Sequence, residues 1–308
     1  MTENVSSGPS EIAAALELVV DARAEVGEGP LWDAEHERLL WVDMTRHLLH
    51  SYWPETGTDS AVDLGRTLGS VVPDGRGGMV VVAEGGLYAL DANGELDKLV
   101  AVGEQLPGYF LNDSRCDPTG RLWVGVTTEA EVPGAGSFYT VSPDLTAKLM
   151  LEDMTIPNGI DWSLDGQTLY VVDSPSLRVE AFSFELSTGE ISQRRTFAAF
   201  EASCGVPDGL TVDAQGGIWV AFWGGWGVRR FTPDGREDLV IELPVEKVSS
   251  CGFGGPENRD LYITTASTGL DDRELQGQPT AGGLFRVPVP FTGRPVRPFR
   301  WAPKKRNQ

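Results

Sequence analysis

The chain has 308 residues, of which 25 are basic and 45 acidic, so its formal charge at neutral pH is −20. This charge argues against nucleic acid and anionic membranes as partners. Glycine (37 residues) and proline (20 residues) are abundant while apolar residues still make up 41% of the chain. Such a composition excludes a disordered protein and is typical of a globular fold with many turns and short strands.

The beginning of the chain lacks the pattern of a signal peptide or a membrane span. The apolar segment from Ile12 to Val20 is short and is interrupted by Glu17, and the first basic residue is Arg23. Cys116, Cys204 and Cys251 lie far apart and form no C-x-x-C pair, which favours buried free thiols over disulfides. We therefore expect a cytoplasmic protein.

One short apolar pattern recurs six times along the chain and predicts a repeated strand. The copies are Leu39–Val42, Met79–Val81, Leu122–Val124, Leu169–Val171, Ile218–Val220 and Leu261–Ile263. Successive copies are 39, 43, 47, 49 and 43 residues apart when they are aligned on one apolar position. Six ordered copies at such even spacing favour a repeat architecture over a β-sandwich with chance similarities.

Each copy follows a turn rich in Asp, Gly or Pro, and a further strand often comes after it, as at Gly86–Leu90, Arg178–Phe182 and Gly227–Phe231. Units of about 45 residues with four short strands are typical of propeller blades. The sequence thus predicts an all-β fold, a six-bladed β-propeller with a central metal site. A strand around Leu16–Ala24 is expected to complete the last blade. The predicted organisation is a flexible N-terminus (residues 1–14), a single propeller domain (residues 15–302) and a flexible tail (residues 303–308).

Because a propeller brings equivalent positions of its blades to one height, the residues 10 to 12 positions before each repeated strand are candidates for a shared site. Four blades have an oxygen-bearing side chain there: Glu28, Asn112, Asn158 and Asp208. The other two blades offer Gly69 or Ser70 and Cys251, so we expect a less polar ring on those sides. Any one of the four could be an ordinary turn residue, as in Asn158-Gly159 and Asp208-Gly209.

Together, two carboxylates and two amides in a confined space favour one bound divalent cation. Oxygen donors point to Ca²⁺ first, with Mg²⁺, Mn²⁺ or Zn²⁺ as alternatives. The three histidines lie within the first 50 residues and there is no G-x-S-x-G motif, which argues against a serine hydrolase and excludes a His-rich zinc site. Asp208 is the candidate base for a metal-assisted hydrolysis. Trp223–Gly227 is expected to form a tight turn rather than a phosphate loop, because no helix pattern and no lysine accompany it.

Several motifs in this order resemble the SMP-30/gluconolactonase family, also called the regucalcin-like family, from about Val26 to Phe285. They are Gly27-Glu28-Gly29-Pro30-Leu31-Trp32, Asn112-Asp113 with Asp117-Pro118-Thr119-Gly120-Arg121, Pro157-Asn158-Gly159-Ile160-Asp161-Trp162-Ser163 and Pro207-Asp208-Gly209-Leu210. The resemblance implies a six-bladed propeller with one divalent ion bound through Glu28, Asn158 and Asp208, and with Asn112 near the metal and the substrate. It also implies that Asp208 is the base in lactone hydrolysis.

Two positions depart from the family pattern. Sugar-lactone members often have Arg where this chain has Phe110, and an acidic residue for which Glu129 is the approximate match. The substrate-binding candidates are therefore Asn112, Phe110 and Glu129, and the apolar Phe110 predicts a less hydroxylated small-molecule lactone. Two alternatives are a phosphotriester (organophosphate) or other ester hydrolase with the same metal site, and a calcium-binding propeller without enzymatic activity.

Overall fold

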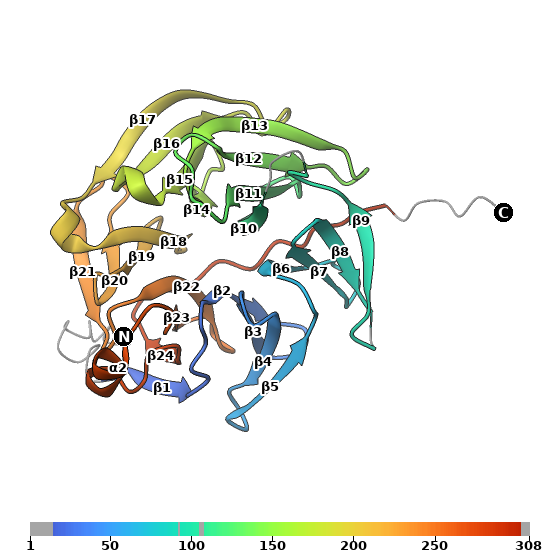
Figure 1. Ribbon diagram of the computed structural model, residues 1–308. Coiled ribbons are helices and arrows are strands. Elements are labelled where there is room, and N and C mark those ends of the chain that lie inside the picture. Colours follow the sequence, from blue (N-terminus) through green and yellow to red (C-terminus); the bar gives the residue numbers. More distant parts are fainter. Residues whose placement is uncertain (1–14, 92, 105–107, 303–308) are drawn as a thin grey trace, which may run out of the picture.

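Six antiparallel sheets of four strands surround a common axis and form a six-bladed β-propeller (Figure 1). The computed structural model describes residues 15–91, 93–104 and 108–302. The predicted all-β, six-bladed propeller is confirmed. The segments predicted to be flexible, residues 1–14 and 303–308, lie outside the described residues.

The blades follow one another along the chain, and the first strand of each lies nearest the axis. Blade 1 consists of β2 (Gly27–Asp33), β3 (Arg38–Asp43), β4 (Leu48–Trp53) and β5 (Thr58–Asp63). Blade 2 consists of β6 (Leu68–Pro73), β7 (Met79–Ala83), β8 (Gly86–Leu90) and β9 (Leu96–Val100). Blade 3 consists of β10 (Tyr109–Cys116), β11 (Leu122–Thr128), β12 (Gly136–Val141) and β13 (Ala147–Met154). Blade 4 consists of β14 (Pro157–Trp162), β15 (Thr168–Asp173), β16 (Arg178–Phe184) and β17 (Ile191–Ala199). Blade 5 consists of β18 (Val206–Val212), β19 (Ile218–Trp223), β20 (Gly227–Phe231) and β21 (Glu237–Glu242). Blade 6 consists of β22 (Val248–Gly254), β23 (Asp260–Thr265), β24 (Leu284–Pro288) and β1 (Glu17–Val20). The six predicted strands are the second strands of the six blades.

Both ends of the described chain contribute to blade 6, and this closes the ring. Strand β1 pairs antiparallel with β24, with Glu17 opposite Arg286 and Leu18 opposite Phe285. The predicted closing strand is therefore present, although it is shorter than Leu16–Ala24. Because strands from both ends of the propeller domain pair within blade 6, the ring of blades has no free end.

An aspartate turn before several second strands explains why the strand pattern recurs. In blade 5, Asp213 accepts hydrogen bonds through Oδ1 from the N–H groups of Gln215 and Gly217, at 2.9 and 2.8 Å. Its Oδ2 accepts from the indole N–H of Trp219, which is fully buried, at 2.9 Å. Asp117 of blade 3 forms the same kind of turn. One side chain thus orders the turn and anchors the aromatic residue of the following strand.

Helical segments are few and short. They are η1 (Ser174–Ser176) and η2 (Ala202–Cys204), both 3-10 turns, and α2 (Asp272–Gly277), which lies between β23 and β24. Across the described ranges, no helix has the length and apolar character needed to cross a membrane.

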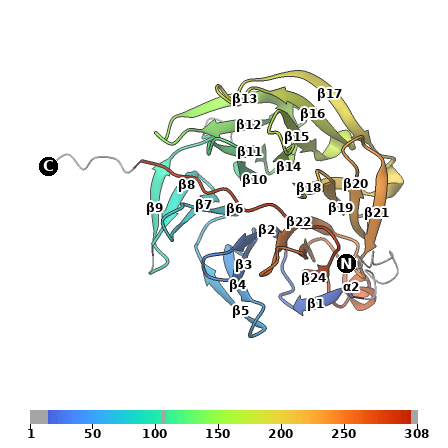
Figure 2. The same cartoon turned by 180° about the vertical axis from the view of Figure 1, so that it is seen from behind.

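The C-terminal segment, residues 289–302, runs across one end of the propeller axis (Figure 2), and we call it the strap. Its backbone is hydrogen-bonded to four blades: Gly293 to Asn258, Thr292 to Ala214, Phe299 to Pro73 and Ala302 to Pro143, at 2.7 to 2.9 Å. Phe299 is fully buried against the core shared by blades 2 and 3. Because Pro73 ends the first strand of blade 2, the strap covers the end of the axis at which the first strands finish, which we call the lower end.

Candidate metal centre

All six first strands contain a β-bulge at the same level, near the upper end of the axis. The pairing register shifts between Glu28 and Leu31, Leu68 and Ser70, Leu111 and Ser114, Pro157 and Ile160, Pro207 and Leu210, and Val248 and Ser250. A bulge inserts one extra residue and turns its side chain away from the regular alternation, and such bulges are common beside functional sites. The four predicted residues lie at or within these bulges, and all four are buried.

Close approach of neighbouring first strands brings these side chains together. A Cβ atom on Gly159 would lie 2.5 Å from the amide nitrogen of Leu210, and one on Gly209 would lie 2.1 Å from Oγ of Ser250. The glycines after Asn158 and Asp208 are therefore needed for contact between blades, because a side chain would force the strands apart. They belong to strands, so the turn interpretation of these Asn-Gly and Asp-Gly pairs is wrong.

The two amides of the predicted ring contact each other directly. Asn112 donates through Nδ2 to Oδ1 of Asn158 at 2.6 Å and to the carbonyl oxygen of Pro157 at 3.0 Å. Asn158 in turn donates through its own Nδ2 to Oγ of Ser174 at 2.8 Å. Blades 3 and 4 thus present two amides at one point beside the axis.

The two carboxylates of the ring are close enough to interact electrostatically. Burial raises the pKa of Glu28 well above its usual value, and the negative charges of Asp208 and Asp113 raise it further. The pKa of Asp208 is likewise raised, by burial and then by Asp113. The N–H of Gly29 donates to Glu28 at 2.9 Å, but Oδ1 of Asp208 is buried and has no hydrogen-bond partner in the described part of the chain. A buried carboxylate oxygen in this state needs a cation or a proton.

This donor set fits one hard divalent cation. It consists of carboxylate and amide oxygens, which are the ligands that Ca²⁺ and Mg²⁺ prefer. The ionised carboxylates supply negative charge, and Oδ1 of Asp208 has no other hydrogen-bond partner in the described chain. Within residues 15–302 as described, no group of three or more His, Cys, Asp or Glu side chains is placed to bind a metal. The amide oxygens of the ring are therefore an essential part of any such site.

Comparison with known proteins identifies the family of this chain. Residues 26–267 match the family model described as SMP-30/Gluconolactonase/LRE-like region. The chain belongs to this SMP-30/gluconolactonase family. The chain is 34% identical to regucalcin of Xenopus laevis, over 88% of this chain and 93% of that protein, and 32% identical to the putative sugar lactone lactonase YvrE of Bacillus subtilis, over 90% and 98%. Among solved structures, the regucalcin of Agrobacterium tumefaciens, described as a calcium-binding protein, superposes with a TM-score of 0.88 at 28% identity and covers 92% of this chain and 96% of its own.

Asp113 is a third carboxylate at the ring to which the sequence assigned no role. Burial raises its pKa to about 6, while the nearby guanidinium of Arg115 lowers it. Asp113 occupies the bulge position at which Gly159 and Gly209 stand in blades 4 and 5. An acidic residue at a position where other blades have glycine is the sequence signal that could have identified Asp113 as a third carboxylate of the ring.

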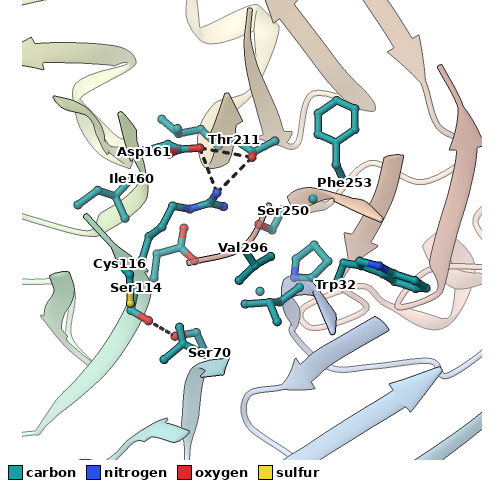
Figure 3. A pocket seen from close by; sticks show the side chains of 18 of the residues that line it. Trp32, Ser70, Ser114, Cys116, Ile160, Asp161, Thr211, Ser250, Phe253 and Val296 are labelled. Atoms are coloured by element: carbon teal, nitrogen blue, oxygen red, sulfur yellow. Dashed lines mark hydrogen bonds and ion pairs between the residues drawn. The ribbon is translucent and has the colours of Figure 1, made fainter. Parts of the chain in front are cut away.

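Of the two sides of the ring that were expected to be less polar, blade 2 has one of the predicted residues, Ser70, whereas blade 6 differs from the prediction. In blade 2, Ser70 is buried and its hydroxyl is hydrogen-bonded to that of Ser114 at 2.5 Å (Figure 3). In blade 6 the bulge shifts the register, so that Ser250 rather than Cys251 hydrogen-bonds to Glu28 and lowers its pKa. Cys251 and Cys116 are buried free thiols as predicted, but Cys204 is half-buried, which corrects that prediction.

The other candidate residues lie at the upper end of blades 3 and 5. Phe110 precedes the bulge of β10, pairs with Thr127 and packs partly against the core of blades 1 and 2. Glu129 is exposed after β11, and its N–H donates to the carbonyl oxygen of Gly108 at 2.8 Å. Contact of either side chain with a substrate stays a prediction. The segment Trp223–Gly227 is a tight turn between β19 and β20, as predicted, and its Trp226 is exposed.

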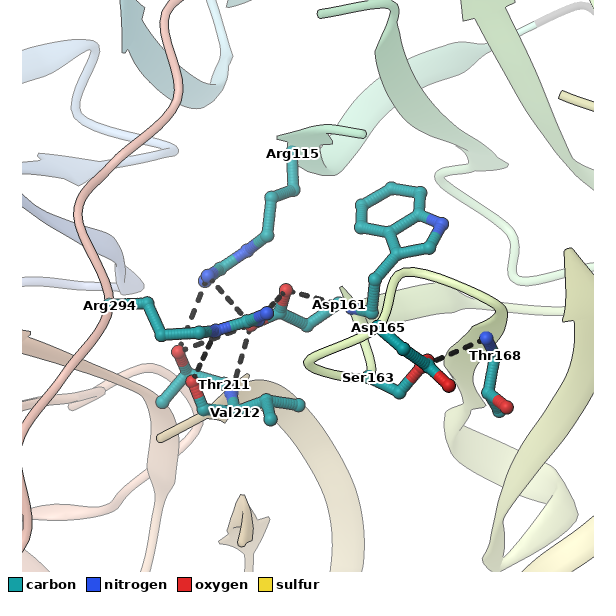
Figure 4. Close-up of polar contacts among 9 residues, drawn as sticks. Arg115, Asp161, Ser163, Asp165, Thr168, Thr211, Val212 and Arg294 are labelled. Atoms are coloured by element: carbon teal, nitrogen blue, oxygen red, sulfur yellow. Dashed lines mark hydrogen bonds and ion pairs between the residues drawn. The ribbon is translucent and has the colours of Figure 1, made fainter. Parts of the chain in front are cut away.

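A cavity of about 80 Å³ lies on the axis between the ring and the strap (Figure 3). It is lined near the ring by Gly29, Asp113 and Ser250, and near the strap by Arg294 and Arg297. Its lower part contains an ion-pair network that the sequence did not predict (Figure 4).

In that network, Asp161 accepts from Arg115 at 3.0 Å and is also hydrogen-bonded to Arg294 of the strap. Burial raises the pKa of Asp161, but the two guanidinium groups outweigh it and lower the pKa below its usual value. Asp161 is therefore ionised and paired, in contrast to the unpaired Asp208 above it.

Proposed function

We propose that this protein is a divalent-metal-dependent hydrolase that opens a lactone ring. The observation that supports this proposal most directly is the buried, unpartnered carboxylate oxygen of Asp208, a residue whose charge interacts with that of Glu28 in the ring that also contains the amides of Asn112 and Asn158. Relatives named as lactonase and regucalcin, which cover nearly the whole chain, give independent support.

In the proposed reaction, Glu28, Asn158 and Asp208 hold the cation, which when bound acts as a Lewis acid towards the lactone carbonyl. Asn112, anchored on Pro157, orients the substrate or the attacking water. Asp208 accepts a proton from the attacking water while the water oxygen forms a bond to the carbonyl carbon. The ring C–O bond then breaks, the leaving alkoxide takes that proton, and the product is a hydroxy acid.

We further propose Ca²⁺ as the cation and a lactone with few hydroxyl groups as the substrate. All donors in the ring are oxygens, which favours Ca²⁺, with Mg²⁺, Mn²⁺ and Zn²⁺ as alternatives. Phe110 stands two positions before Asn112, where sugar-lactone members of the family often have Arg, so this position offers no side-chain hydrogen bond to a polyhydroxylated ring. Glu129 remains the candidate acidic contact, and the compartment proposed for this reaction is the cytoplasm.

The decisive experiment is an assay of the metal-stripped and metal-restored protein on lactones of graded polarity and on a phosphotriester. We expect turnover only after a divalent ion is restored, and faster turnover of alkyl or aryl lactones than of aldonolactones. Asn158→Ala and Asp208→Ala should lose both metal binding and turnover, whereas Asn93→Ala, which changes an exposed turn amide, should retain both.

Each alternative has its own outcome in this assay. Full activity after chelation, or a fully active Asp208→Ala, would refute the mechanism. Preference for aldonolactones would refute the apolar-substrate proposal alone. A phosphotriester hydrolysed much faster than any lactone would favour the organophosphate hydrolase. Metal binding without turnover of any substrate would favour a calcium-binding propeller, an activity named for the Agrobacterium regucalcin.

A further inference from the structure

The side-chain amide of Asn158 has two chemically different ends, and only one of them can bind a cation. Its Oδ1 is an acceptor, whereas its Nδ2 is a donor that would repel a metal ion. Rotation of the amide by a half turn exchanges the two ends without changing the shape of the side chain. A metal site that uses Asn158 therefore needs a partner that fixes which end faces the ring.

Ser174 is placed to be that partner. Its Oγ accepts from Nδ2 of Asn158 at 2.8 Å, and both residues are buried, with exposed fractions of 4% and 6%. With Nδ2 held by Ser174, Oδ1 of Asn158 points to the ring, where it meets Nδ2 of Asn112 at 2.6 Å. A flipped amide would instead bring two N–H₂ groups together. The N–H₂ of Asn158 would lose Ser174 as its acceptor, and that of Asn112 would keep only the carbonyl oxygen of Pro157.

The backbone around Ser174 is itself fixed to the strand that bears Asn158. The N–H of Ser174 donates to the carbonyl oxygen of Ile156 at 3.2 Å. Asp173, directly before it, accepts from the N–H groups of Thr155 and Ile156 at 3.0 and 2.9 Å. The serine hydroxyl is thus held at a constant position relative to Asn158.

We infer that Ser174 is a positioning residue, which selects the orientation of Asn158 that presents oxygen to the cation. This inference rests on the proposed metal site and extends it by one residue. Ser174 does not contact the ion or the substrate in this scheme. It acts through Asn158 on the affinity for the metal.

The test measures Ca²⁺ binding by calorimetry to the metal-stripped full-length protein. Ser174→Ala should weaken Ca²⁺ binding by about tenfold, the lower range seen when a residue that orients a ligand is removed. In an Asn158→Asp background the same substitution should not weaken binding, because a carboxylate offers an oxygen in both orientations. The dependence of the effect on residue 158 distinguishes orientation from general damage to the structure.

Two further variants control for packing and folding. Ser176→Ala changes a neighbouring serine of η1 whose hydroxyl has no partner in the described chain, and it should bind Ca²⁺ as the wild type does. Ser174→Cys keeps nearly the same volume with a weaker acceptor, and should give an intermediate loss even if the alanine variant folds poorly.

The outcomes separate the inference from the proposed function. Wild-type affinity in both Ser174 variants, or an equal loss in the wild-type and Asn158→Asp backgrounds, would overturn the positioning role and leave the metal site intact. Failure of the wild-type protein to bind Ca²⁺, Mg²⁺, Mn²⁺ or Zn²⁺ would overturn the metal site, and the positioning role with it.

Discussion

Glu28, Asp113 and Asp208 are three neighbouring carboxylates that cannot all be ionised at low cost. Burial is the main cause of their raised pKa values, and repulsion by their neighbours adds to it for Glu28 and Asp208. Since an unfolded Asp or Glu titrates near about 4, these groups bind protons more tightly in the folded state. Their contribution to stability is complete below that unfolded pKa and is lost as the pH rises through the folded pKa, which is about 6 for Asp113.

We therefore predict that the free energy of unfolding of the metal-free protein falls as the pH rises from about 4 through about 6, as judged by denaturant titration with chelator present. Saturating Ca²⁺ should reduce or reverse this fall, because the ion binds the deprotonated carboxylates. A concentration of 100 times Kd stabilises by about 2.7 kcal/mol. Asp113→Asn, which removes one of the three charges, should show a weaker pH dependence. A profile that is flat without metal and unaffected by Ca²⁺ would contradict this account.

At the scale of the element, the bulges decide which side chains enter the ring. The sequence predicts Glu28, Asn112, Asn158 and Asp208 because each stands 10 to 12 positions before a repeated apolar strand. It does not distinguish Ser250 from Cys251, since the bulge in β22 changes the direction of successive side chains, and the extent of a bulge depends on the paired strand. The sequence does not predict Ser174 either, because this residue follows β15 at the start of η1 and reaches Asn158 of β14 only through a hydrogen bond between the two segments.

Close packing of β14 against β18 makes Gly159 a sensitive position. A Cβ atom there would lie 2.5 Å from the amide nitrogen of Leu210 and 2.6 Å from the carbonyl oxygen of Asp208, so the backbone must move. We predict that Gly159→Ala destabilises the fold by about 1–3 kcal/mol, a typical cost of overpacking. Because the movement separates Asn158 from Asp208, Ca²⁺ affinity should also decrease.

Thermal unfolding and calorimetry test this prediction, with Gly277→Ala as the control. Gly277 ends α2, and a Cβ atom there has no heavy atom within 4 Å, so this variant should match the wild type in both measurements. If Gly159→Ala kept the stability and the Ca²⁺ affinity of the wild type, the contact between the two strands would not set the geometry of the ring.

At the scale of the whole molecule, two features hold the six blades together: the pairing of β1 with β24, and the strap. Only the first can be predicted from the sequence. The pairing of β1 with β24 follows from an apolar strand pattern near the beginning of the chain. The strap has no such pattern, since residues 289–302 contain three prolines and form no strand. Its path across the axis depends on individual contacts with blades 2, 3, 5 and 6, which no local periodicity encodes.

The strap should therefore contribute to stability without affecting the metal site. Phe299 is fully buried between blades 2 and 3, and Phe→Ala substitutions in cores cost about 3–5 kcal/mol. We predict a loss of this order for Phe299→Ala in urea denaturation, with Ca²⁺ affinity close to the wild-type value because the ring lies towards the opposite end of the axis. Arg300→Ala, which changes the exposed neighbouring residue, should be nearly neutral. A large drop in Ca²⁺ affinity in Phe299→Ala under conditions in which it is fully folded would show instead that the strap and the ring are coupled through the cavity between them.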